Sequence, residues 1–140
     1  MSCLTTGLCF VLTALPSQVT AIDGDTLRVQ LTAEHRAYVR LFGIDTEERN
    51  EPNGPAAKAH LQSLVNRGDS VVCHPIGKMS YQRQISRCYI LVGEMKYELN
   101  SLMVKDGFAL DCARYSKGMY RVLEPDDSRK RLLAKPYCDK

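Results

Sequence analysis

Three stretches near the start of the chain alternate apolar and polar residues, the pattern of strands that bury one face. They are residues 18–22, 26–32 and 38–44. Gly24 supplies a turn between the first two stretches, and residues 33–35 supply the next turn. The pattern therefore predicts a three-stranded meander.

A helical period replaces this alternation farther along the chain. Pro55 suits the first turn of a helix, and Gly68 suits its end. The apolar stripe expected to face the core consists of Ala57, Leu61, Leu64 and Val65. We therefore predict an amphipathic helix between the proline and the glycine.

Two further strand-like stretches and a short helix follow. The stretches are residues 70–76 and 84–92, and the helical pattern of residues 99–106 ends at Gly107. The order of three strands, a helix, two strands and a helix is typical of an α+β fold. We predict a five-stranded OB-type β-barrel with about three α-helices packed outside.

The last part of the chain has a helical pattern that Pro125 interrupts. Proline donates no hydrogen bond in a helix interior, and it pushes the preceding Glu124 out of the α region. We expect a break at this point and a shorter helix over residues 126–134.

Residues 1–17 have features of a signal or leader segment. The apolar run from Leu4 to Leu15 has the length of a signal core and is far too short to span a membrane, although no basic residue precedes it. Such a leader implies a secreted or periplasmic protein, with the cytoplasm as the alternative. Residues 18–140 have the length of one domain, and we expect a monomer that does not enter the membrane.

The composition is that of an ordinary folded domain. Hydrophobic residues make up 44% of the 140 residues and charged residues 25%, which excludes disordered and fibrous classes. The net charge of +3 is uneven, because residues 114–140 hold eight Lys or Arg and four acidic residues, leaving −1 for the rest. This basic segment is either a solvated helix face or a surface for a polyanion.

Six cysteines show no C-x-x-C spacing, and the three histidines make no zinc-like spacing with them. Without the leader four cysteines remain. Cys73 and Cys88 are equidistant from the middle of the loop between the last two predicted strands, so a hairpin would place them opposite each other. Cys112 and Cys138 could then tie down the tail. The alternative is four reduced cysteines buried as small hydrophobic residues.

Two acidic turns follow predicted strands. Asp25 lies in the sequence IDGDT and Asp45 in IDTEE, and the meander brings the two turns to neighbouring positions. Two carboxylates held together repel each other, and a calcium ion with oxygen ligands relieves that repulsion. Each turn alone is also ordinary turn chemistry, since Asp caps the turn and Gly adopts positive φ. The pair predicts a site for one Ca²⁺ or another divalent ion.

Two arginines and a third carboxylate suggest a phosphodiester substrate. Arg40 lies on the strand that leads to Asp45, and Arg83 lies in the last predicted hairpin. Guanidinium groups bind phosphate oxygens in bidentate geometry and keep their charge. Glu48 is then placed to hold or deprotonate an attacking water. Taken alone, Arg40 is equally well explained as a surface arginine paired with an acid.

Six segments together resemble the staphylococcal nuclease-like (thermonuclease) domain. In order they are VTAIDGDTLRV, YVRLFGIDTEE, GPAAKAHLQSL, YQRQISRCYI, LNSLMVKDGFA and RYSKGMYRVLE, and the resemblance covers residues 18–124. It implies a five-stranded OB-type barrel with three helices. It also implies a calcium-dependent phosphodiesterase that cuts DNA and RNA, preferably single-stranded, at the 5′ P–O bond and leaves 3′-phosphates.

The resemblance implies a role for individual residues. Asp25 and Asp45 match the carboxylate ligands of the ion, and Thr46 matches the residue that gives it a backbone carbonyl. These three positions are therefore the expected metal site.

The remaining positions match groups that act on the nucleic acid. Glu48 matches the glutamate that activates water, and Arg40 and Arg83 match the two phosphate-binding arginines. Tyr81 and Tyr115 match aromatic residues beside the nucleotide, where base stacking tolerates any sequence.

The sequence also departs from the pattern of that family. Glu47 stands where proline is usual, and a carboxylate there could raise the pKa of Glu48 or favour a different ion. The hairpin has Gln82 where glycine is usual, which could change the aim of Arg83. Ala113 replaces a second tyrosine on the nucleotide side.

Three functions remain to be compared. An active metal-dependent nuclease uses all six predicted metal and catalytic positions. A nucleic-acid-binding or protein-binding module on the same barrel, catalytically weak or inactive, is the alternative. A structural domain held by disulfides explains the cysteines but gives the acidic turns and the arginines no role.

Overall fold

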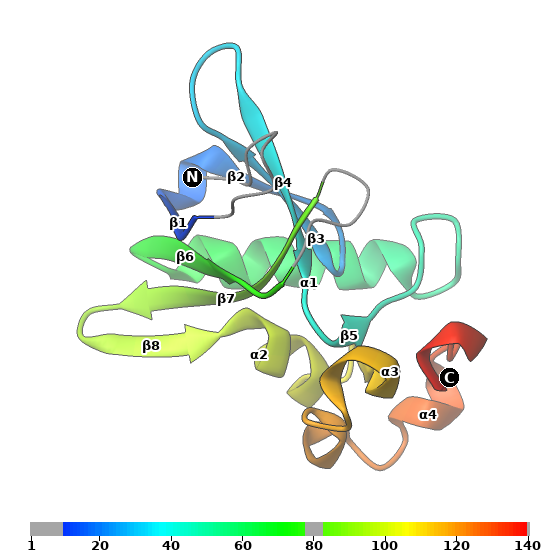
Figure 1. Ribbon diagram of the computed structural model, residues 1–140. Coiled ribbons are helices and arrows are strands. Elements are labelled where there is room, and N and C mark those ends of the chain that lie inside the picture. Colours follow the sequence, from blue (N-terminus) through cyan, green and yellow to red (C-terminus); the bar gives the residue numbers. More distant parts are fainter. Residues whose placement is uncertain (1–9, 78–82, 140) are drawn as a thin grey trace.

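The structure is a computed structural model, and it describes residues 10–77 and 83–139. The predicted meander forms one side of its main sheet, as Figure 1 shows. β2 (Val19–Asp23), β3 (Thr26–Gln30) and β4 (Arg36–Leu41) pair as antiparallel neighbours. Leu27 and Val29 are fully buried, as their spacing predicts.

The other side of the sheet is the hairpin of β6 (Ser70–Pro75) and β7 (Gln84–Val92). Cys73 lies opposite Cys88 in this hairpin, and the two form a disulfide, which confirms the predicted pairing. The hairpin joins the meander because β7 runs parallel to β4.

Two strands that the sequence pattern did not indicate extend the sheet. β1 (Leu12–Ala14) pairs with β6, and β8 (Met95–Glu98) pairs with β7. The resulting seven-stranded sheet has the order β1-β6-β7-β4-β3-β2, with β8 beside β7, and it does not close. The α+β, OB-type prediction is therefore confirmed, with an open sheet of seven strands in place of the predicted five-stranded barrel.

β1 lies inside the expected leader. Leu12 is fully buried and Ala14 nearly so, because β1 covers one end of the core beside β6. Removal of residues 1–17 would take this strand away, and whether it occurs stays a prediction.

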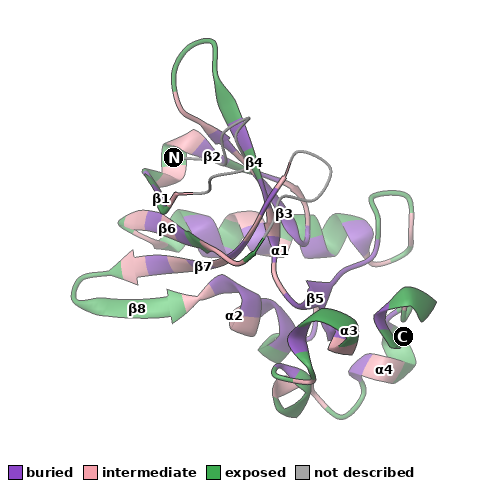
Figure 2. Ribbon diagram, in the orientation of Figure 1, coloured by how far each residue is buried: buried purple, intermediate pink, exposed green. Residues whose placement is uncertain are grey.

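Two helices cover the sheet and enclose the core, shown in purple in Figure 2. α1 (Gly54–Arg67) packs against β2 and buries the predicted stripe of Ala57, Leu61, Leu64 and Val65. α2 (Leu99–Lys105) packs against β7. The buried Asn100 fixes this contact, since its amide accepts from Cys88 N and donates to Phe42 O.

The tail contains only short helical turns. They are α3 (Ala113–Ser116), η2 (Arg121–Leu123), α4 (Ser128–Arg131) and η3 (Pro136–Asp139). The break at Pro125 is confirmed, because Glu124 has extended backbone angles. The helix predicted over residues 126–134 is wrong in length. It ends early because Arg131 O accepts from Asn53 and Leu133 N donates to Glu47, both outside the helix.

A second disulfide and a small second sheet hold the tail against the body of the protein. Cys112 bonds to Cys138, as predicted. β5 (Ile44–Asp45) pairs with β9 (Leu110–Asp111). Within the described residues, none of the helices is both long and apolar enough to cross a membrane.

Candidate active site

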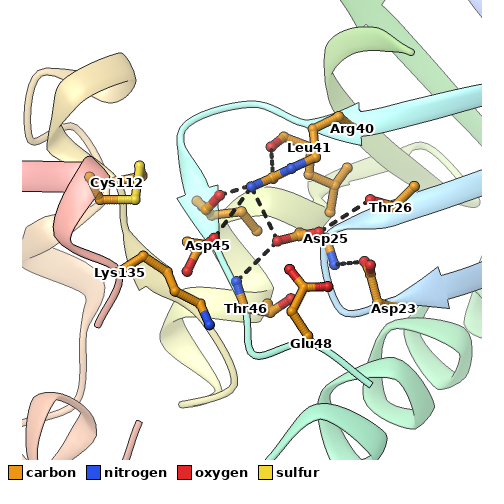
Figure 3. A network of polar contacts seen from close by, with 12 residues as sticks. Asp23, Asp25, Thr26, Arg40, Leu41, Asp45, Thr46, Glu48, Cys112 and Lys135 are labelled. Carbon is orange, nitrogen blue, oxygen red and sulfur yellow. Dashed lines mark hydrogen bonds and ion pairs between the residues drawn. A yellow bond between two sulfur atoms is a disulfide. The ribbon is translucent and has the colours of Figure 1, made fainter. Parts of the chain in front are cut away.

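Asp25 and Asp45 come together at one end of the meander, as predicted. Asp25 lies in the turn between β2 and β3, and Asp45 ends β5. Both are buried, at 6% and 5% exposure. One nitrogen of Arg40, Nη2, lies 3.2 Å from Asp25 Oδ2 and 3.6 Å from Asp45 Oδ1, so a single guanidinium bridges the two carboxylates (Figure 3).

The turn that carries Asp25 requires glycine for a reason that differs from the expected one. Gly24 does not have positive φ. A Cβ at this position would instead lie 2.6 Å from the Cβ of Ala57 and 2.9 Å from that of Thr46. Gly24 is therefore required because α1 and the second acidic turn pack directly against it and leave no space for a side chain.

The guanidinium of Arg40 is also fixed to the backbone. Its Nη1 donates to Leu41 O at 2.7 Å and to Ile44 O at 3.0 Å. These bonds tie the end of β4 to β5, so Arg40 shapes the turn that leads to Asp45. Burial is the largest single influence on the pKa of Arg40 and lowers it. The negative charges of Asp25 and Asp45 together outweigh burial, so the pKa of Arg40 is raised above its usual value.

Asp25 organises the second acidic turn through its carboxylate. Oδ2 accepts the backbone N–H of Thr46 at 3.0 Å, and Oδ1 accepts the Thr26 hydroxyl at 3.2 Å. Asp23 Oδ1 in turn accepts the backbone N–H of Asp25 at 3.1 Å. The carboxylate of Asp25 thus connects its own turn to a residue 21 positions farther along the chain.

The carboxylates outnumber the cation that holds them. Burial, the largest cause, and neighbouring Asp25 raise the pKa of Asp23 to about 7. Burial also raises the pKa of Asp45 to about 6, against the lowering effect of a hydrogen bond from Tyr137. Such shifts mark a place where negative charge is crowded, and a divalent cation would relieve it.

Glu48 lies beside this cluster. It is exposed, and its carboxylate points toward Asp25 and Thr46 in Figure 3. Its backbone N–H donates to Glu51 Oε1 at 2.7 Å, which fixes the start of the loop after β5. The third predicted carboxylate is therefore near the first two and open to solvent.

Glu47, the residue that departs from the family pattern, faces inward and is 2% exposed. Its carboxylate accepts Asn53 N at 3.1 Å, Asn53 Nδ2 at 2.6 Å and Leu133 N at 3.2 Å. It joins the loop after β5 to the tail. This placement explains how the chain accommodates a carboxylate next to Glu48.

The structure gives less information on the other three predicted residues. Tyr81 lies outside the described residues. Arg83 directly precedes β7 and is half-buried. In the parallel register Arg40 lies opposite Ile85, and strand residues two apart share a face, so Arg83 is expected on the same face as Arg40. Tyr115 is 54% exposed on α3, with its ring beside Arg114.

Sequence reasoning missed the contribution of the tail. Tyr137 donates a 2.6 Å hydrogen bond to Asp45 Oδ1, and Lys135 forms an ion pair with Glu51. The predicted Cys112–Cys138 pair was the sequence feature that could have indicated this contribution. The disulfide holds the tail beside the end of β9, and β9 pairs with β5, the strand that carries Asp45.

The residues present fit a hard cation. The hydroxyl of Thr46 is buried without a hydrogen-bond partner among the described residues, next to two crowded carboxylates. Within residues 10–77 and 83–139, no three or more His, Cys, Asp or Glu side chains converge on a metal position. A cation bound here would therefore have two carboxylates as ligands, together with a backbone carbonyl and waters, which is a set of oxygen ligands that calcium accepts.

The sequence of this chain is similar to those of known proteins. A protein of Mycoplasma genitalium described as an uncharacterized lipoprotein is 28% identical over 107 residues. The alignment covers 65% of this chain and 42% of the relative, so the chain spans less than half of that protein.

The sequence model of the family described as staphylococcal nuclease homologue matches residues 38–129. This range contains Arg40, Asp45, Glu48 and Arg83, whereas Asp25 precedes it and Tyr137 follows it. The match covers more than half of the chain, and the chain therefore belongs to the staphylococcal nuclease homologue family.

Proposed function

We propose that this protein is a calcium-dependent phosphodiesterase that hydrolyses DNA, RNA or both. The observation that carries the proposal is the buried pair Asp25 and Asp45, bridged by Arg40, with the exposed carboxylate of Glu48 beside it. Membership of a family that is classically calcium-dependent supports the same conclusion.

Asp25, Asp45 and the backbone carbonyl of Thr46 are the proposed ligands of the ion. When bound, calcium would supply positive charge against the negative charge that develops on the phosphate. Burial of both carboxylates supports this role, because buried charges are stable only when they are paired with an opposite charge or coordinate a metal ion.

Glu48 is the proposed general base. It takes a proton from water, whose oxygen attacks phosphorus in line with the 5′ oxygen; the P–O5′ bond breaks, the 5′ oxygen takes a proton from solvent, and a 3′-phosphate remains. Arg40 and Arg83 hold the phosphate oxygens during this step. Tyr81 and Tyr115 are proposed to stack against bases, preferably of a single strand.

A nucleic-acid-binding module without strong catalysis is the second candidate function. One observation favours it: Arg40 already binds two carboxylates and two backbone carbonyls, so a phosphate has to compete for its donors. The paired cysteines and the similarity to a lipoprotein support a secreted or periplasmic location for either function.

The first prediction separates the two candidates. The 140-residue chain should degrade single-stranded DNA when CaCl₂ is supplied and stop when EGTA is added. Glu48→Gln should lower kcat by about 10²- to 10⁴-fold, the usual contribution of a general base, while DNA binding is kept. Gel electrophoresis and fluorescence anisotropy measure the two properties.

Glu94→Gln is the matched control, since Glu94 is exposed in the turn between β7 and β8. It should keep the parent activity. A Glu48→Gln variant as active as the parent would reject the proposed base. A parent that binds DNA but does not cleave it with calcium would favour the binding module.

A further inference from the structure

The loop that carries the proposed base is held by the tail at several points. Tyr137 donates to Asp45 at 2.6 Å, Leu133 N donates to Glu47 at 3.2 Å, and Lys135 pairs with Glu51. Every one of these contacts joins residues at least 84 positions apart in the chain.

Lys135 is connected to Glu48 through a single oxygen atom of Glu51. Glu51 Oε1, the oxygen that pairs with Lys135, also accepts the backbone N–H of Glu48. Lys135 extends from the tail toward the loop of Thr46 and Glu48 in Figure 3. The tail is thus connected to the proposed base as well as to a proposed metal ligand.

The contact of Tyr137 acts on a specific oxygen. Its phenol and Arg40 both approach Asp45 Oδ1, whereas Oδ2 has no hydrogen bond to any residue in the described part of the chain. The hydrogen bond from Tyr137 and the ion pair with Arg40 act on the same oxygen, which fixes the rotation of the carboxylate and leaves the second oxygen available. Outer partners of this kind orient metal-binding carboxylates in proteins.

One covalent bond keeps Tyr137 in place. Cys138, the next residue, is bonded to Cys112, and Cys112 directly follows β9, the strand that pairs with β5. A small hollow between these parts is lined by Asp45 and Leu110 on one side and by Lys135 and Cys138 on the other. The tail therefore rests on the strand that carries Asp45.

We propose that Tyr137 is a positioning residue for Asp45 and that the Cys112–Cys138 disulfide holds Tyr137 beside Asp45. The calcium affinity of the site therefore depends on this disulfide. The inference rests on the proposed function, and it deepens it by assigning a role to residues beyond the matched range 38–129. Reduction of the bond would release the phenol and weaken calcium binding without touching any ligand.

The second prediction tests this inference with a double-mutant cycle on the 140-residue chain. Calorimetric titration with CaCl₂ gives the Kd of the parent, of Tyr137→Phe, of the Cys112→Ser and Cys138→Ser double variant, and of all three changes combined. Tyr137→Phe should raise Kd about tenfold, as loss of an outer partner typically does. The disulfide variant should raise Kd at least as much, and adding Tyr137→Phe to it should change nothing further.

Tyr97→Phe, which removes a phenol from the exposed strand β8, is the control and should bind calcium like the parent. Tyr137 is 39% exposed, so its change to Phe removes a hydrogen bond and little packing. Its melting temperature in EGTA should therefore stay within a few degrees of the parent value.

Each outcome decides the matter. A Kd of Tyr137→Phe within twofold of the parent, or additive effects in the combined variant, would overturn the inference while the proposed function stands. Should the double serine variant not fold, Tyr137→Phe decides alone. A parent that binds no calcium would overturn the proposed metal, and the inference with it.

Discussion

At the scale of single residues, Arg40 has a structural duty in addition to the proposed catalytic one. It neutralises Asp25 and Asp45 and ties β4 to β5 through two carbonyls. Removal of one partner from a buried ion pair is strongly destabilising, because the other charge is left uncompensated. Loss of activity in an Arg40 variant therefore has two causes, and stability measurements are needed to separate them.

The third prediction concerns Arg40→Gln. Its free energy of unfolding in EGTA should fall by about 3 kcal/mol, the lower end for a broken buried pair. CaCl₂ should raise its melting temperature more than that of the parent, because the ion supplies the positive charge that the variant lacks. Thermal unfolding followed by circular dichroism measures both quantities.

Arg28→Gln is the control, since Arg28 lies on neighbouring β3, opposite Tyr38. It should change stability by less than about 1 kcal/mol, as most surface substitutions do. Equal calcium shifts in the parent and in Arg40→Gln would show that the ion and the guanidinium do not act on the same carboxylates.

The residues of the candidate site divide into those that local sequence could predict and those that it could not. Asp25 and Asp45 were predictable, because an antiparallel meander places the turn between its first two strands beside the end of its third strand. Tyr137 was not, since it lies 92 residues from Asp45 and its position depends on a disulfide and on the β5–β9 pair. The inward direction of Glu47 has the same cause, a partner in the distant tail.

At the scale of elements, strands with one buried face and α1 followed from hydrophobic periodicity. β8 did not, because Met95, Lys96 and Tyr97 are all exposed and the strand has no apolar face to recognise. β1 was hidden in an apolar run that suits a signal core equally well as a strand. Short edge strands are thus the elements for which the pattern gives the weakest signal.

The fourth prediction tests β1. A chain that starts at Gln18 should be about 2–3 kcal/mol less stable than a chain that starts at Phe10, since a fully buried Leu contributes about that amount and only the longer chain keeps Leu12. Urea unfolding of the two truncated chains in EGTA measures the difference. Equal stability of both would mean that β1 adds nothing and that a leader ending at residue 17 could be removed without cost to the fold.

At the scale of the whole molecule, the two disulfides serve different parts. Cys73–Cys88 lies within one hairpin, whose strands are already paired by backbone hydrogen bonds. Cys112–Cys138 holds a tail that, in its described residues, consists of short helical turns and contributes no strand to either sheet. The order of the tail therefore depends on this bond more than the sheet depends on the other.

The fifth prediction follows from that difference. Replacement of Cys112 and Cys138 by Ser should lower the free energy of unfolding in EGTA by about 3.5 kcal/mol, the loop-closure estimate for a bond that spans 26 residues. Trypsin should then cut first after Arg129, Lys130 or Arg131, while the sheet stays intact. Mass spectrometry of the fragments measures this, and first cuts within β2, β3 or β4 would contradict it.

The tail also has a consequence for how this protein can be joined to others. Tyr137 touches Asp45 two residues before Asp139, the last residue that the structure describes. A purification tag or a fused domain joined directly after Asp139 would start within a few residues of Tyr137 and would crowd a nucleic acid bound at the candidate site. A label attached in the β7–β8 turn, at the opposite end of the sheet in Figure 1, would avoid that interference.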